Sequence, residues 1–231
     1  MSADGAPGIV RIASAGDSAL LIEFPQTISP AINARAIALA DAIRRRCGTA
    51  VRDAVVGYAT LTLYFDPLVV DATWMEAETR EIAAAADDGL GGSGVLVEVP
   101  VCYGGQFGPD LEDVAVFGGC SQEEVIAIHA ESTYRVYMIG FVPGFAYMAV
   151  VDDRIAAPRR PTPRSAVPAG SVAIAGAQTG IYPAVTPGGW NIIGRTPLKP
   201  FDVARSQPTL FRAGDMVRFR PISPREYDDL R

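Results

Sequence analysis

The chain has 231 residues, of which 49% are hydrophobic and 20% are charged, and it carries a formal net charge of -6 at pH 7. This composition is typical of a water-soluble chain with one large or two small domains, and the acidic balance argues against nucleic acid as a partner. No apolar run approaches the roughly 20 residues of a membrane-spanning helix, and residues 1–10 lack the pattern of a secretory signal. We therefore expect a cytoplasmic protein that does not bind a membrane.

The N-terminal part of the chain combines strand and helix patterns in the order βαββα. The three strand patterns lie at 18–24, 51–56 and 59–65. A further strand at 94–101 would complete a ferredoxin-like βαββαβ unit, or it would instead open the next domain. Residues 87–94, which are rich in glycine, are the expected linker.

Both helices of this part have recognisable ends. The first is expected to begin after Ser29, an N-cap residue, and to end before Gly48. The second is expected over 71–87, where Thr73 and Glu76 have the spacing of a capping box.

The pattern changes in the remaining chain. A short helix is predicted at 121–132, where Ser121 and Glu124 have capping-box spacing. It is followed by short apolar runs between glycine and proline turns, which indicate an all-β sandwich or a closed barrel. We therefore predict an α+β protein with a small α/β domain at 1–90 and a β domain at 91–231.

Basic residues are concentrated in one segment of the β domain. From Arg154 to Phe201 there are six basic residues and no Asp or Glu. Glycine turns in the same segment could point backbone N–H groups outward, which would suit an anionic ligand such as a carboxylate or a phosphate. The alternative is that these arginines are solvated or pair with acids from elsewhere in the fold.

Several common catalytic sites are excluded by residues that the chain lacks. It has one histidine, His129, and one lysine, Lys199, so it has neither a histidine cluster for zinc nor a Walker A loop. No Rossmann fingerprint and no nucleophile elbow is present. Its three cysteines are widely spaced and are expected to be reduced thiols, so we predict no metal site.

Two residues with suitable chemistry for catalysis remain. His129 shares a helix face with Val125, so we expect it to pack in the core, with catalysis as the alternative. Ser171 begins a strand after a glycine turn and is expected to form local hydrogen bonds, with a Ser–His pair as the alternative. Core packing explains most of the aromatic residues in the segment 134–147, but Pro143 and Gly144 interrupt the strand there, as happens where a ligand or a second backbone approaches closely. The loop candidates are Pro143, Gly144 and Phe145.

Four segments of the β domain follow one another as a recognisable series. They are PVCYGGQFGPDLEDVA, YRVYMIGFVPGFAYM, PRRPTPRSAVPAGSVAIAGAQTGIYPAVTPGGWNIIGRTPL and AGDMVRFRPIS. In this order they resemble the signatures of the family of 5-oxoprolinase B subunits, also called the allophanate hydrolase subunit 1 or kinase-inhibitor KipI family. N-terminal segments GDSALLIEF and YATLTLYFDP extend the resemblance over nearly the whole chain. The resemblance implies a small α/β domain followed by a cyclophilin-like β-barrel.

The resemblance also implies partners and a reaction. Together with a carboxyltransferase-like C-type protein, a B-type protein is implied to phosphorylate 5-oxoproline with ATP and Mg as its counter-ion, and an A-type protein then opens the ring to give glutamate. This chain would be inactive alone. The alternatives are one subunit of a urea- or allophanate-metabolising hydrolase and a KipI-like inhibitor of a sensor histidine kinase. Biotin on this chain is excluded, because Lys199 lacks the Met-Lys-Met setting of a carrier domain.

These implications suggest that residues 170–197 and the arginines before them shape half of a binding site, with the partner supplying the missing catalytic groups. Glycine and proline would fix the loops and let the backbone approach the ligand. The candidates for binding substrate or an anion are Arg159, Arg164, Gly170, Ser171, Gln178, Thr179, Gly180, Tyr182, Gly188, Gly189, Trp190 and Arg195.

Overall fold

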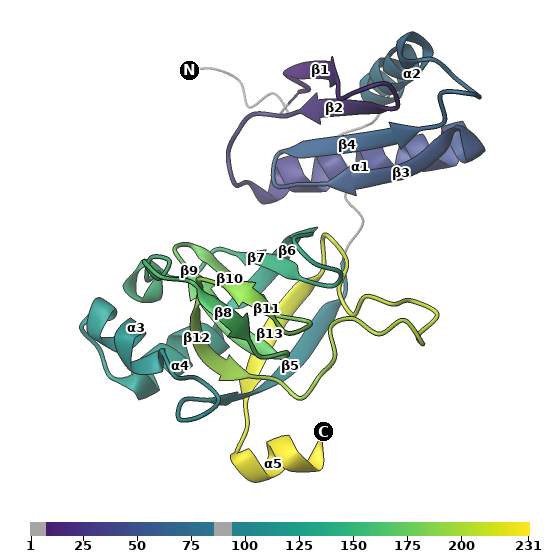
Figure 1. The fold of residues 1–231 in the computed structure, drawn as a ribbon. Helices are drawn as coiled ribbons and strands as arrows, with labels where there is room; N and C mark the ends of the chain where they lie inside the picture. Colours follow the sequence, from purple (N-terminus) through teal and green to yellow (C-terminus); the bar gives the residue numbers. More distant parts are fainter. Residues whose placement is uncertain (1–7, 86–93) are drawn as a thin grey trace, which may run out of the picture. The chain divides into compact units, whose positions relative to one another are not determined.

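The structure is a computed structural model that describes residues 8–85 and 94–231. The chain forms two compact units, which meet in the sequence between Ser93 and Gly94 (Figure 1). The predicted linker at 87–94 lies, apart from Gly94, outside the described residues. No helix in the described part is both long and apolar enough to cross a membrane.

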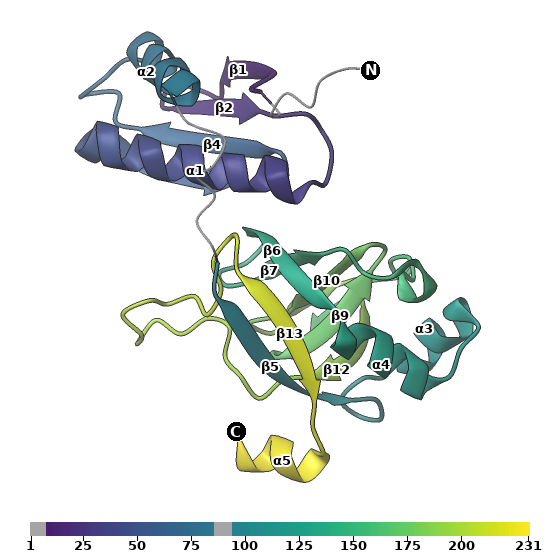
Figure 2. The ribbon, with the colours of Figure 1, turned by 180° about the vertical axis from the view of Figure 1, so that it is seen from behind.

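Over residues 8–85, the N-terminal unit forms an antiparallel four-stranded sheet in the order β1-β2-β4-β3. The two helices in this range contact each other and pack against the sheet (Figures 1 and 2). The elements are β1 (Arg11–Ser14), β2 (Ala19–Glu23), α1 (Pro30–Cys47), the 3-10 turn η1 (Gly48–Ala50), β3 (Val51–Val56), β4 (Thr60–Phe65) and α2 (Ala72–Ala85). Aliphatic side chains from the sheet and α1 form one buried cluster, which is the core of this unit.

This sheet has a ferredoxin-like arrangement, except that a different strand occupies one edge. Strands β2, β4 and β3 hold the places of the first three strands of a βαββαβ unit. The fourth place, beside β2, is taken by β1, whose Ile12 lies opposite Ile22. The expected strand at 94–101 therefore opens the next unit, which was the alternative. Strand β1 was not predicted, because four residues are too few for an alternating pattern to stand out.

Helix ends in this unit follow local signals. Helix α1 begins and ends as predicted, with the Ser29 side chain at its N-cap and Gly48 at its C-cap with a positive φ of +51°. The capping box predicted for α2 is wrong. Asp71 Oδ1 accepts the bond from Trp74 N at 2.8 Å, so the capping residue is Asp71 and Thr73 lies inside the helix.

The second unit is built around a closed barrel of seven strands, in the order β10-β7-β6-β13-β5-β12-β9. The barrel strands are β5 (Leu96–Tyr103), β6 (Thr133–Ile139), β7 (Ala146–Ala149), β9 (Ser171–Ala175), β10 (Gln178–Ile181), β12 (Asn191–Arg195) and β13 (Met216–Pro221). The remaining elements are α3 (Leu111–Gly118), α4 (Gln122–Glu131), the 3-10 turn η2 (Asp153–Ile155), α5 (Pro224–Asp229) and a two-stranded sheet of β8 (Arg164–Val167) and β11 (Thr186–Gly188).

The barrel is closed by pairing its first and last strands. Strands β5 and β13 run parallel, with Val99 opposite Phe219, and the other neighbouring strands are antiparallel. Closure leaves the barrel without an open sheet edge and encloses an apolar core that includes Val136 and Ile174. The predicted α+β fold with a ferredoxin-like unit and a cyclophilin-like β-barrel is thereby confirmed. The capping box at Ser121 is also present, at the start of α4.

Candidate functional site

The candidate site is a pocket of about 250 Å³ on the outside of the barrel, next to the β8–β11 sheet. Met148 of β7 belongs to the barrel core, so its neighbour Tyr147 points to the opposite, outer face. Five aromatic residues line the pocket: Phe141, Phe145, Tyr147, Tyr182 and Trp190. The other lining residues are Arg159, Pro163, Pro187, Gly188 and Gly189.

The aromatic rings are organised around Phe145, which is 1% exposed. Its ring meets those of Phe141, Tyr147, Tyr182 and Trp190 edge to face, with centroids 5.7, 4.7, 5.2 and 5.4 Å away. Edge-to-face contacts at these distances are favourable, because the positive edge of one ring meets the negative face of another. Rings from the β6–β7 loop, β7 and the segments after β10 and β11 are thus locked into one rigid wall.

Phe141 is the unusual member of this cluster. It is 60% exposed, although phenylalanine is normally buried, and its φ of +70° lies in the left-handed region. Such a conformation costs on the order of 1 kcal/mol for a bulky residue and is typical of functional sites. The loop therefore holds an apolar ring at the rim of the pocket at a cost to stability.

The two tyrosines of the pocket are neutral at physiological pH. Burial raises the pKa of the Tyr147 and Tyr182 phenols above the ordinary value of 10, and the positive charge of Arg159 opposes this only in part. Both phenols can donate hydrogen bonds to a ligand but cannot act as bases near pH 7.

Arg159 supplies the positive charge among the lining residues. Its guanidinium carbon lies 5.9 Å from the centroid of the Trp190 ring, within cation–π range. Within the described chain, no carboxylate forms an ion pair with Arg159. The arginines before and after it do have such partners: Arg154 pairs with Asp152 at 3.0 Å and Arg160 with Asp110 at 2.7 Å.

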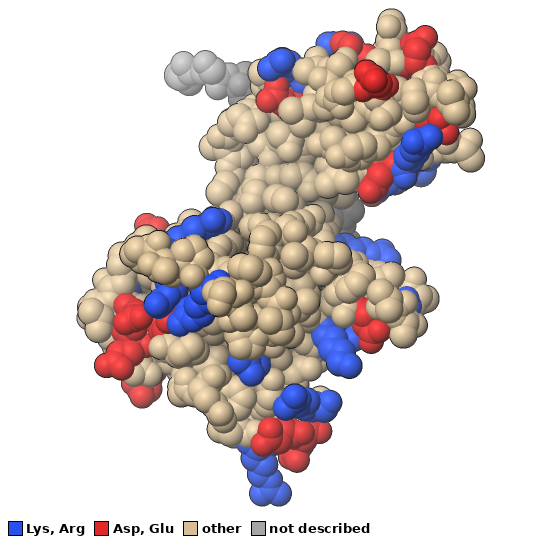
Figure 3. Space-filling view, viewed as in Figure 1, with Lys and Arg blue, Asp and Glu red and all other residues tan. Residues whose placement is uncertain are grey.

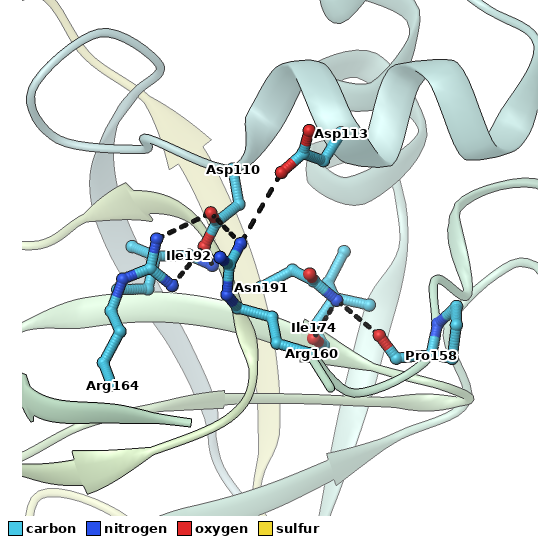
Figure 4. A network of polar contacts seen from close by, with 8 residues as sticks. All are labelled: Asp110, Asp113, Pro158, Arg160, Arg164, Ile174, Asn191 and Ile192. Atoms are coloured by element: carbon cyan, nitrogen blue, oxygen red, sulfur yellow. Dashed lines mark hydrogen bonds and ion pairs between the residues drawn. The ribbon is translucent and has the colours of Figure 1, made fainter. Parts of the chain in front are cut away.

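Asp110 is the centre of a buried network beside the pocket (Figure 4). It is 2% exposed and accepts hydrogen bonds from Arg160 Nη1 at 2.7 Å, from Arg164 Nη1 and Nη2 at 2.8 and 2.7 Å, and from Ile192 N at 2.7 Å. The hydrogen bond with Asp110 raises the pKa of Arg164, so this arginine stays charged. Asp113 also approaches Arg160, at 3.6 Å, but its side chain is 70% exposed.

This network corrects the assignment of Arg164 to an anion site. Its guanidinium already binds a carboxylate through two parallel hydrogen bonds, as in the alternative in which these arginines pair with acids from elsewhere in the fold. Asp110 was missed because it lies 54 positions from Arg164 and no local pattern joins the two. Asn191 was missed for the same reason: its Nδ2 binds Pro158 O at 2.8 Å.

Glycines in the candidate stretch mostly serve packing. A Cβ at Gly170 would overlap Thr196 O, and one at Gly180 would lie 3.0 Å from the Phe145 ring. Both residues are buried in or beside barrel strands, so their backbone does not form the open cradle that was expected. Gly188 does line the pocket, and a Cβ there would overlap the Tyr182 hydroxyl. Gly189 has room for a methyl group, with Pro163 3.6 Å away.

His129 lies wholly buried, as expected for a packing histidine. It stacks on Phe219 with centroids 4.4 Å apart, and burial lowers its pKa to about 3. Thr179 donates its hydroxyl hydrogen to Ala173 O, so it accepts a bond from His129 Nε2 at 3.0 Å. His129 Nδ1 then accepts from the Tyr103 hydroxyl at 2.8 Å. Thr179 thus belongs to this inner network and does not line the pocket.

Ser171 and Arg195 lie opposite each other on β9 and β12. Ser171 Oγ and Arg195 Nε are both buried and have no hydrogen-bond partner among the described residues. The expected local hydrogen bonding of the Ser171 side chain is therefore wrong. Neither residue lines the pocket.

The structure brings six of the predicted residues together at the pocket: Phe145, Arg159, Tyr182, Gly188, Gly189 and Trp190. It places the other binding and loop candidates elsewhere in the barrel unit: Pro143, Gly144, Arg164, Gly170, Ser171, Gln178, Thr179, Gly180 and Arg195. On the face that carries β8 and β11, basic side chains lie beside a broad uncharged area, and acidic side chains gather over α3 (Figure 3).

Comparisons with known proteins agree with this architecture. The family model "Carboxyltransferase domain, subdomain C and D" matches residues 10–211. The chain is 42% identical to the 5-oxoprolinase B subunit of Bacillus subtilis, over 94% of this chain and 95% of that protein. It is 38% identical to the protein of the same name from Escherichia coli O157:H7, over 89% and 93% of the two chains.

Solved structures extend the comparison. TTHA0988 superposes with a TM-score of 0.80 at 38% identity, and the match covers 90% of this chain but 40% of TTHA0988. Urea amidolyase of K. lactis shares the fold alone, with a TM-score of 0.78 at 17% identity over 99% of this chain and 16% of that one. Because the family model and relatives at 38–44% identity match most of its length, the chain belongs to the family of 5-oxoprolinase B subunits, within the carboxyltransferase subdomain C and D proteins.

Proposed function

We propose that this chain is the B subunit of a cytoplasmic, ATP-dependent 5-oxoprolinase and works with a C-type partner protein. The observation that carries this proposal is the near full-length match to the 5-oxoprolinase B subunit of Bacillus subtilis, at 42% identity. In this proposal the two proteins activate 5-oxoproline by phosphorylation, and an A-type protein then opens the ring to give glutamate.

The chemistry of the pocket supports a division of labour between proteins of the complex. Its lining residues offer one guanidinium, two neutral phenols and aromatic walls, and they include no carboxylate, histidine, cysteine or lysine. Such a site can bind and orient an anion, but it lacks a base and a strong nucleophile. TTHA0988 is more than twice as long as the part that matches this chain, which supports the view that the fold works together with further polypeptide. We therefore expect the chain to be inactive alone.

ATP and Mg do not fit this pocket. Its volume of about 250 Å³ is below the 300–1,000 Å³ typical of sites for drug-sized ligands, so a nucleoside triphosphate would extend far outside it. Asp110, the buried carboxylate beside the pocket, is already bound by two arginines. We therefore assign the nucleotide and its metal to the assembled complex and not to this pocket.

The test is ATP hydrolysis stimulated by 5-oxoproline. It is measured with this chain alone, with the C-type partner alone, and with the two co-expressed. Stimulation in the complex only is the expected result. A stable complex without stimulation would contradict the proposal, and stimulation by urea or allophanate in place of 5-oxoproline would favour the hydrolase alternative.

A further inference from the structure

The pocket combines a cation without a counter-ion and an apolar wall. Arg159 has no ion-pair partner in the described chain, and the rings of Tyr147 and Trp190 stand beside it. A second cation would be repelled by the guanidinium, and a wholly apolar ligand would leave it without an anionic partner. The lining therefore favours a ligand with one negative group and one apolar or flat part.

Arg159 is held in place from both sides along the chain. Before it, Pro158 O accepts a hydrogen bond from Asn191 Nδ2 at 2.8 Å. After it, Arg160 N donates to Gly189 O at 2.8 Å, and the Arg160 side chain binds Asp110. The backbone of Arg159 is thus anchored by its two neighbours, so part of the entropy of ordering it for a ligand is already lost on folding.

The shape of the pocket limits the size of the ligand. A Cβ at Gly188 would overlap the Tyr182 hydroxyl, so the wall is already at its closest approach there. About 250 Å³ holds a compact ring with one substituent, whereas a nucleotide would extend far outside it. The planar guanidinium fork matches a carboxylate through two parallel hydrogen bonds, and neutral phenols can donate to a carbonyl oxygen.

From these features we propose that the pocket binds a small carboxylate attached to a compact, uncharged ring. The Arg159 guanidinium meets the carboxylate, and the rings of Tyr147 and Trp190 flank the ligand ring. A cyclic amide with a carboxylate has this chemistry, so the inference deepens the proposed function and rests on it for the identity of the ring. Asp110 acts as a positioning residue through Arg160.

Binding can be followed by the fluorescence of Trp190. The chain has two tryptophans, so Trp74→Phe leaves Trp190 as the only indole emitter. This variant is titrated, alone and with the C-type partner, with 5-oxoproline, with cyclopentanecarboxylate and with 2-pyrrolidinone, which keeps the ring but lacks the carboxylate. We expect saturable changes for both carboxylates and at least tenfold weaker binding of 2-pyrrolidinone.

Matched arginine variants identify the carboxylate receptor. Arg159→Gln is expected to weaken 5-oxoproline binding at least tenfold, and Arg159→Lys to give an intermediate loss because it keeps charge without the fork. Arg154→Gln, which removes an exposed arginine paired with Asp152, is expected to leave binding unchanged. Equal affinity for 2-pyrrolidinone, unchanged binding by Arg159→Gln, or no saturable change with or without the partner would overturn the inference.

The proposed function and this inference fail in different ways. If the complex shows stimulated ATP hydrolysis but Arg159→Gln leaves the KM for 5-oxoproline unchanged, the pocket assignment is wrong and the function stands. If Arg159→Gln abolishes binding of carboxylates but no stimulation is found, the pocket binds such anions and the assigned reaction is wrong.

Discussion

The two units of the chain differ in what they bury. Two polar side chains are fully buried in the described part of the N-terminal unit, Asn33 and Thr79, and in the ion pairs between its described residues the arginine is at least 45% exposed. The barrel unit buries more polar groups: Asp110, His129, Ser171, Thr179, Asn191, Thr196 and Asp215. Both units therefore have an apolar core, but the second also contains buried polar pairs between distant segments, and the largest of these networks lies beside its pocket.

The difference can be measured separately in each unit, because Trp74 lies in the first and Trp190 in the second. Urea unfolding followed in Trp74→Phe reports the barrel unit, and in Trp190→Phe it reports the N-terminal unit. All variants of the barrel unit are therefore made in the first background, and those of the N-terminal unit in the second.

Removal of Asp110 is expected to have the largest effect. Asp110→Ala leaves two partly buried arginines without their carboxylate and Ile192 N without its acceptor. Breaking such a pair from one side typically costs 3–5 kcal/mol, and we expect a loss of about 3 kcal/mol in the barrel unit because both arginines keep some contact with water. The measurement is the free energy of unfolding reported by Trp190.

Two controls accompany this variant. Asp113→Ala removes a carboxylate near the same Arg160, but one that is 70% exposed, and should cost less than about 1 kcal/mol. Glu76→Ala removes an exposed ion pair of the N-terminal unit and should change its stability by about 0.5 kcal/mol or less. Equal losses in the free energy of unfolding for Asp110→Ala and Asp113→Ala would mean that burial of the Asp110 network adds nothing to the stability of the barrel unit.

Acid should destabilise the barrel unit through His129. Burial lowers the pKa of His129 in the folded state to about 3, from an ordinary value of 6.5. Between these two pH values the histidine is therefore protonated in the unfolded chain but neutral in the folded chain. Stability is therefore complete above pH 6.5 and falls as the pH drops, by about 1.4 kcal/mol per unit, or about 2 kcal/mol at pH 5.

Between pH 6.5 and pH 5 the effect of the histidine can be separated from that of the carboxylates, because most carboxylates titrate below pH 5. His129→Gln should remove this slope from the Trp190 signal. The N-terminal unit contains no histidine and should show no slope in this range. A slope that persists in His129→Gln, or that is equal in both units, would assign the acid sensitivity to other groups.

The same difference between units explains what could be predicted from sequence. The helix ends at Ser29 and Ser121 depend on contacts within four residues, and such local signals are visible in the sequence. Asp110 binds Ile192 across 82 positions, and nothing in the sequence marks that pair. The barrel was predicted as a class, from short apolar runs between turns, without its strand pairing.

At the site, the amino-acid composition identified the segment that forms much of the pocket, but it did not show the role of each arginine in that segment. Six candidates line the pocket, and five of them are glycine or aromatic residues, which concentrate where rings and backbones approach closely. Arg159 and Arg164 look equivalent in the sequence, yet one has no ion-pair partner in the described chain and the other is bound by Asp110. That distinction depends on the folded path of a distant carboxylate. A ligand cradle is the role that the sequence favours for the glycines, but Gly170 and Gly180 allow tight packing in the structure.

The smallest expected effect concerns the rim of the pocket, where the barrel unit exposes the apolar side chain of Phe141 instead of burying it. Phe141→Gly relieves the left-handed strain of about 1 kcal/mol, but it loses a ring contact with Phe145 and adds the flexibility of glycine to the unfolded chain. These terms nearly cancel, so stability should change by about 0.5 kcal/mol or less. Phe141→Ala loses the same ring and keeps the strain, but it avoids the flexibility of glycine in the unfolded chain, so it should be less stable than Phe141→Gly by about 0.5 kcal/mol, the reverse of the usual order. Both variants should weaken 5-oxoproline binding in the Trp190 titration equally, because binding depends on the missing ring and stability on the backbone. If the alanine variant were the more stable one, Phe141 would not be held under strain, and its exposed ring would need another explanation.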